Sequence, residues 1–108
     1  MEESKVLCAA NSYNQKYYFN PEFDRLPEGI QEDLQIMCVL FTEEVGGVLS
    51  LKFTPEGSLE FETSSNSDDF FYDEIGSALK IKKIRTERRE LLEGLELFYR
   101  IFYLGEQV

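Results

Sequence analysis

Apolar residues in the last third of the chain recur at the spacing of an α-helix. One face holds four residues at steps of four, three and four, Leu91, Leu95, Phe98 and Phe102, and is widened by Leu92 and Tyr99. A second apolar stripe, on another side, contains Leu97, Ile101 and Leu104. We predict a helix from about Thr86 to Leu104 that ends at Gly105. Because two of its sides are apolar, both must be covered, either by the rest of the chain or by a second copy of it.

A second helical pattern lies between Pro27 and Gly46. Proline is tolerated in a first helical turn, and a glycine pair is a typical helix end. The apolar face of this helix comprises Ile30, Leu34, Met37, Cys38, Phe41 and Val45. Three further apolar residues lie on other sides, namely Ile36, Val39 and Leu40. We therefore predict that the middle of this helix is buried on more than one side.

Two hairpins are predicted from the remaining apolar segments. Residues 48–53 and 58–63 alternate apolar and polar side chains, and the Pro- and Gly-containing segment 54–57 between them is a turn. Residues 5–10 and 15–19 form an earlier hairpin around the turn formers between them. Pro21 stops that hairpin, and one helical turn is expected over residues 21–25.

A third helix is predicted after the second hairpin. Asp68 or Asp69 is the expected cap, and the apolar face comprises Phe71, Ile75 and Leu79. The pattern leaves open whether residues 80–86 continue this helix or bend, since Thr86 with Glu90 offers a second helix start.

The predicted order is β-β-α-β-β-α-α, which is typical of an α+β fold. We expect two β-hairpins forming an antiparallel sheet packed by helices, with a long C-terminal helix. No repeat or linker interrupts the chain, so we predict a single domain over residues 1–108, with residues 1–4 as a flexible tail. The pattern does not define the strand order.

The composition narrows the possible functions. The 108 residues carry a formal net charge of -10, which disfavours nucleic acid and anionic membranes as partners. The chain has no histidine, the commonest metal ligand and acid–base group at neutral pH. We therefore expect no cofactor, no metal site and no catalytic residues, and predict that the protein is not an enzyme. An acidic start and the lack of a long apolar segment favour a cytoplasmic location.

Basic residues concentrate in one short segment. Residues 80–89 contain six of the eleven, Lys80, Lys82, Lys83, Arg85, Arg88 and Arg89, against one acidic residue. The segment carries +5 and the rest of the chain -15. Such a patch could bind an anionic ligand. It could equally pair with the chain's own acids, such as Asp69, Asp73 and Glu74, or with those of a partner.

Four segments of the chain together resemble a family of short uncharacterised acidic proteins from anaerobic, clostridium-like bacteria. They are residues 15–20, 36–47, 73–82 and 97–105. The resemblance implies a domain of unknown function in a bacterial cytoplasmic protein. It brings no activity and no functional residues.

The leading hypothesis from the sequence is a non-enzymatic interaction or scaffold protein that forms a homodimer. The expected interface is the second stripe of the last helix, with Leu97, Ile101, Tyr103 and Leu104. If both long helices are instead buried within one core, the chain is a monomer. Two alternatives are a module that binds an anionic ligand through residues 80–89, and an acidic inhibitor or immunity-type decoy.

Overall fold

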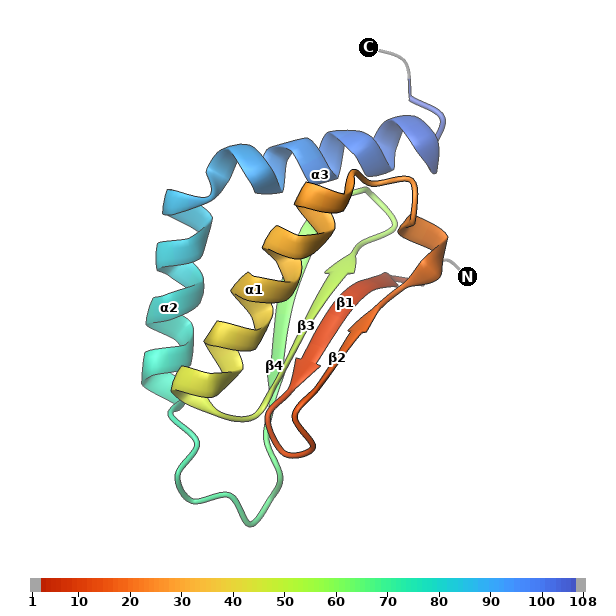
Figure 1. Cartoon of the computed structure of the whole chain (residues 1–108). Coiled ribbons are helices and arrows are strands. Elements are labelled where there is room, and N and C mark those ends of the chain that lie inside the picture. The colour runs from red at the N-terminus through yellow and green to blue at the C-terminus, as the bar shows by residue number, and fades with distance from the viewer. Residues whose placement is uncertain (1–2, 107–108) are drawn as a thin grey trace.

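The computed structural model describes residues 3–106, which form one antiparallel sheet and three α-helices (Figure 1). The strands are β1 (Lys5–Asn11), β2 (Lys16–Phe19), β3 (Val48–Phe53) and β4 (Leu59–Ser64). The helices are η1 (Pro21–Phe23, a 3-10 turn), α1 (Glu28–Val45), α2 (Glu74–Glu87) and α3 (Arg89–Phe102). The predicted α+β class and element order are confirmed.

Both hairpins belong to a single sheet with the strand order β2-β1-β3-β4. The hairpins join where β1 pairs antiparallel with β3, for example at Ala10 opposite Leu49. A register shift lies between Val6 and Cys8, which is typical of a β-bulge. The extra residue, Leu7, is fully buried beside Cys8, so strict alternation fails at this point of β1.

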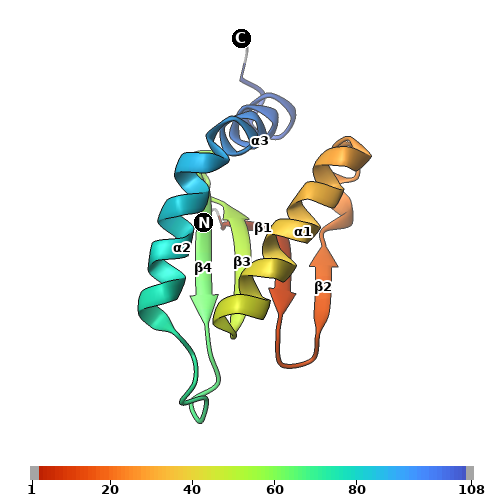
Figure 2. The ribbon, with the colours of Figure 1, turned by 60° about the vertical axis from the view of Figure 1, so that its left-hand side comes forward.

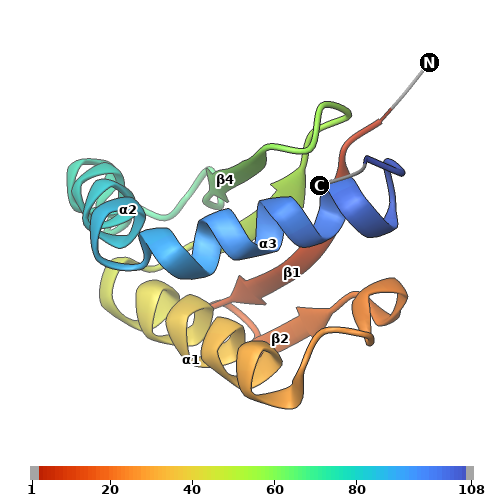
Figure 3. The same cartoon turned by 90° about the horizontal axis from the view of Figure 1, so that it is seen from above.

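The sheet has one dry and one wet face. Leu49, Leu51 and Phe53 of β3 are fully buried, while Ser50 and Lys52 between them are half-buried on the opposite face. Helices α1 and α2 lie side by side along the strands (Figure 2). Helix α3 runs from the end of α2 across the molecule (Figure 3). Within the described residues, no helix is both long and apolar enough to cross a membrane.

An aromatic cluster fixes α3 at one end of the sheet. The ring of Tyr99 stacks on Phe53 at 4.3 Å between centroids with 10° between planes, and Phe23 of η1 packs on the Phe53 ring at 5.5 Å. The backbone N–H of Leu59 donates to Glu96 Oε2 at 2.7 Å. Strand, turn and helix residues therefore form one closed end of the core.

The predicted apolar faces of the two long helices need correction. In α3 the buried residues are Leu92, Leu95 and Tyr99, whereas Phe102 of the predicted face is exposed. Leu91 and Phe98 of that face are partly buried against the core, and Tyr99 stacks on Phe53. In α1 the sheet covers one side only, so Ile36 and Leu40 are exposed and the prediction of burial on several sides is wrong for the single chain.

The predicted start and face of the third helix are also wrong. Asp73, not Asp68 or Asp69, caps α2 by accepting a hydrogen bond from the N–H of Gly76 at 2.8 Å. Asp69 instead accepts from the N–H of Phe71 and from the Tyr13 hydroxyl, which holds it in a turn against the first hairpin. The predicted apolar face faces solvent, because Ser77, Ile81 and Ile84 pack inward.

The segment that the sequence left undecided is helical. Residues 80–86 continue α2, and the chain bends at Arg88, one residue before α3 begins. Thr86 does not start a helix; its hydroxyl donates to the carbonyl of Lys82 inside α2. The helix predicted from Thr86 to Leu104 is thus divided. Its first two residues belong to α2, and residues 89–102 form α3.

Candidate functional site

Half of the basic segment holds α2 against its neighbours. Arg88 Nη2 lies 3.4 Å from Asp33 Oδ2 of α1, and Lys80 pairs with Glu44 of the same helix. Arg85 donates to the carbonyl of Leu59 at 3.2 Å and stands 4.9 Å above the ring of Phe61. The acids that pair are those of α1, and not the expected Asp69, Asp73 and Glu74. These bases have a structural role.

The other three bases project from the molecule. Lys83 is close only to Glu87 of its own helix, at 3.8 Å. Lys82 and Arg89 make no ion pair or side-chain hydrogen bond within residues 3–106. The segment 80–89 is therefore two sets of residues, one engaged inside the chain and one available to a partner.

Large apolar side chains are exposed where α2 begins. Phe70 and Phe71 precede the helix and are 89% and 95% exposed, and Ile75 and Leu79 are 76% and 63% exposed. Ile75 and Leu79 are one turn apart, and Lys82 and Lys83 continue the same side. We call Ile75, Leu79, Lys82 and Lys83 the outer face of α2. Exposed apolar side chains that gather in one place, beside charges, are typical of interaction sites.

Helix α1 presents a second exposed face beside the first. Its members, Glu32, Ile36, Leu40 and Glu43, recur every three or four residues and are all exposed; we call them the outer face of α1. Helix α1 has five acidic and no basic residues, Glu28, Glu32, Asp33, Glu43 and Glu44. Asp33 and Glu44 bridge to α2, so the two outer faces adjoin.

The expected interface on α3 is partly used within the chain. Leu97 is 48% exposed and Ile101 is half-buried. A Cβ atom placed on Gly57 would lie 3.1 Å from Leu104 Cδ1, so Leu104 covers the turn between β3 and β4. The Tyr103 ring packs on Phe23 at 5.0 Å. These four residues do not form one free stripe.

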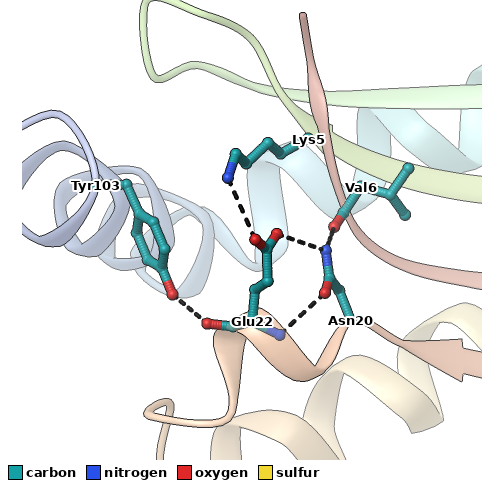
Figure 4. A network of polar contacts seen from close by, with 5 residues as sticks. All are labelled: Lys5, Val6, Asn20, Glu22 and Tyr103. Atoms are coloured by element: carbon teal, nitrogen blue, oxygen red, sulfur yellow. Dashed lines mark hydrogen bonds and ion pairs between the residues drawn. The ribbon is translucent and has the colours of Figure 1, made fainter.

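A polar network fastens the end of α3 to the first hairpin (Figure 4). The Tyr103 hydroxyl donates to the carbonyl of Glu22, whose N–H donates to Asn20 Oδ1 at 3.0 Å. Asn20 Nδ2 donates to the carbonyl of Val6 at 2.7 Å, and Lys5 Nζ lies 3.5 Å from Glu22 Oε1. The network joins β1, η1 and the end of α3, so its polar groups are already engaged in contacts within the chain.

The two cysteines form a buried pair rather than a reactive site. Cys8 Sγ and Cys38 Sγ are 3.8 Å apart, unbonded and fully buried, as predicted for Cys38. A groove of about 750 Å³ lies between the first hairpin and α1, but its lining, which includes Tyr17, Gln35 and Thr42, contains neither thiol. Residues 3–106 contain no group of three His, Cys, Asp or Glu side chains placed to hold a metal.

Acidic residues do not gather on one surface. Those of α1 lie on the helical side, whereas Glu60 and Glu62 project from β4 between residues that face the helices. Lys52 Nζ is 3.0 Å from Glu62 Oε2 on that side. An acidic decoy needs its acids on one exposed face, so this distribution disfavours that alternative.

The fold and its surface define a small α+β protein whose distinctive feature is a helical face with separated charges. The chain belongs to a family of unknown function, DUF6145, which matches residues 4–107. No curated protein and no solved structure matches it. The predicted membership of a family of unknown function is confirmed; the predicted bacterial source stays a prediction.

Proposed function

We propose that this protein is a non-enzymatic interaction protein that acts as a homodimer. One observation carries the proposal: the large apolar side chains of residues 70–79 face solvent at the start of α2. Leaving such side chains in water forgoes on the order of 1.5–3 kcal/mol each, which a partner that covers them would recover. Exposed basic side chains directly beyond them give the surface a polar rim.

The proposal of a non-enzymatic role rests on the residue types that are accessible. The sequence contains no histidine, and both thiols are fully buried. Histidine, the commonest acid–base group, therefore does not occur in the chain, and the thiols, its most nucleophilic groups, have no contact with solvent. The same unbonded thiols support a location in the reducing cytoplasm.

The α3 stripe is the second candidate for the interface. Leu97 favours it, because this side chain is nearly half exposed. The outer face of α2 ranks first because Leu79 is more exposed than Leu97 and adjoins the outer face of α1. The exposed bases Lys82 and Arg89 favour the alternative of an anionic ligand. Polyphosphate binding that is unchanged when both bases are replaced would argue against this alternative.

Two matched substitutions test the proposal. Leu79→Glu places a charge on the outer face of α2, and Leu97→Glu places the same charge on the α3 stripe. We expect Leu79→Glu to weaken self-association on the order of 100-fold and Leu97→Glu to leave it within a few-fold of the unchanged protein. Sedimentation velocity over a concentration series measures both. The reverse ranking would move the interface to α3, and a monomer at tens of micromolar would end the homodimer proposal.

A further inference from the structure

The separation of charge between α1 and α2 specifies how two copies fit together. Resting on the proposed homodimer, we infer that a two-fold axis parallel to these helices relates the copies. Helix α1 of each protomer then packs on α2 of its partner. The partner of the helical face is thus a second copy of this chain, in one defined orientation.

Charge complementarity is the first step of the argument. The described residues of α1 carry five acids and no base, while residues 80–89, which span the end of α2 and the bend into α3, carry +5. Part of this charge is neutralised inside the chain, by the Lys80–Glu44 and Arg88–Asp33 pairs. Within residues 3–106, Glu32 and Glu43 of α1 and Lys82 and Arg89 take part in no ion pair. Among the described residues, these two acids and two bases therefore have no ion-pair partner of opposite charge.

The relative direction of the helices places these groups at matching heights. Helices α1 and α2 run antiparallel, because Asp33 pairs with Arg88 and Glu44 pairs with Lys80. Arg89 directly follows Arg88 at the bend before α3, so it lies close to the height of Asp33 and Glu32, and Glu43 is within a turn of Lys82. An axis parallel to the helices preserves these heights. It brings each acid of one copy to the corresponding base of the other.

The same arrangement covers Ile36 and Leu40 of the outer face of α1 and Leu79 of the outer face of α2. Ile36 and Leu40 lie between the two acids along α1 and are level with the last two turns of α2. There the aliphatic stems of Lys82 and Lys83 can lie over them while their ammonium groups reach the acids. Leu79, next to Lys80 in the chain, is level with Glu44 at the end of α1, one turn beyond Leu40.

Charge also excludes the other symmetric arrangement. A two-fold axis across the helices would stack α1 on α1 and α2 on α2. The unpaired acids Glu32 and Glu43 would then oppose acids, and the exposed bases of α2 would oppose bases. Like charges across an interface are unfavourable and suppress such a mode of association. Of the two face-to-face arrangements, one attracts and one repels.

Reciprocal charge reversal tests the orientation. The acid variant is Glu32→Lys with Glu43→Lys, and the base variant is Lys82→Glu with Arg89→Glu. Each changes two exposed positions. Each variant alone should lose self-association on the order of 100-fold, because four attractive contacts become repulsive. An equimolar mixture should form a heterodimer, and this rescue would also show that both variants fold. Glu60→Lys, on the opposite face of the sheet, is the control and should dimerise normally.

The outcomes separate the orientation from the homodimer itself. Dimers of both variants as tight as the unchanged protein would overturn the orientation and leave the homodimer standing through another surface. Variants that are monomeric alone and also in the mixture would overturn the pairing of α1 with α2. An unchanged protein that is monomeric would overturn both proposals. Sedimentation velocity with one variant labelled distinguishes these results.

Discussion

Two thiols lie in contact in the core of this protein, and the half-buried phenol of Tyr17 packs against that core. Cys8 of β1 and Cys38 of α1 are 30 residues apart in the chain and in contact in the core. The contact with Cys8, together with burial, raises the pKa of the Cys38 thiol. Burial beside Cys8 raises the pKa of the Tyr17 hydroxyl. Both groups therefore stay protonated in the folded chain at neutral pH.

These pKa shifts predict a loss of stability at alkaline pH. In the unfolded chain Cys38 ionises near its ordinary pKa of 9.0, whereas in the folded chain it keeps its proton. Above that pH the unfolded state binds fewer protons, so the free energy of unfolding falls as the pH rises. The contribution of Cys38 is fully present below about pH 9 and is reduced by about 1.4 kcal/mol at one pH unit above it. Urea unfolding at neutral and alkaline pH measures this dependence.

Cys38→Ala is the matched control for that prediction. The variant is less stable at every pH because it leaves a small cavity, but its free energy of unfolding should depend less on alkaline pH. An identical pH dependence in both proteins would assign the alkaline loss to other groups. The sequence pattern predicted that Cys38 is buried, because it lies on the apolar face of α1. It could not predict the contact with Cys8, which depends on how α1 crosses the sheet.

At the scale of elements, the strands follow their local pattern more closely than the helices do. Residues 48–53 alternate strictly, and the face predicted to be buried is the buried one. In α2, two stripes have equally regular spacing, and the core takes the one with Ser77 and Ile81 and not the one with Ile75 and Leu79. Contacts outside the helix decide between them, since the hydroxyl of Tyr72, in the loop before α2, donates to the Ser77 hydroxyl at 3.1 Å. Periodicity alone holds no information on that choice.

The junction between α1 and β3 offers a sharp test of the packing. Gly47 has a φ of 71°, and a Cβ atom there would lie 2.5 Å from the carbonyl oxygen of Ser64 and 2.6 Å from the Tyr72 ring. Gly47→Ala should therefore cost about 2–4 kcal/mol of stability, through backbone strain and the collision with the loop before α2. Thermal and chemical unfolding measure the loss.

Gly94 provides the control for that substitution. A Cβ atom at this position of α3 meets nothing within 4 Å. Gly94→Ala should stabilise the protein by up to about 1 kcal/mol, because alanine favours the helix. Equal effects of the two substitutions would contradict the close approach at Gly47.

At the scale of the whole molecule, charge is the organising feature of the helical surface. The sequence identified the +5 segment and its contrast with the remaining -15. It did not identify which bases are engaged internally, because Asp33 and Glu44 lie far along the chain from Arg88 and Lys80. The acidic outer face of α1 carried a signal that could have been found, since this helix has five acids and no base. Its position beside α2 follows only from the folded structure.

The homodimer is the central claim, and its mass in solution tests it most directly. Sedimentation equilibrium at about 0.05 M and about 0.5 M salt separates the contributions of apolar contact and charge. We predict a mass twice the 12.6 kDa of one chain at low salt and weaker association at high salt, because the ion pairs between α1 and α2 are screened. A mass of 12.6 kDa at both salt concentrations and tens of micromolar protein would contradict the claim.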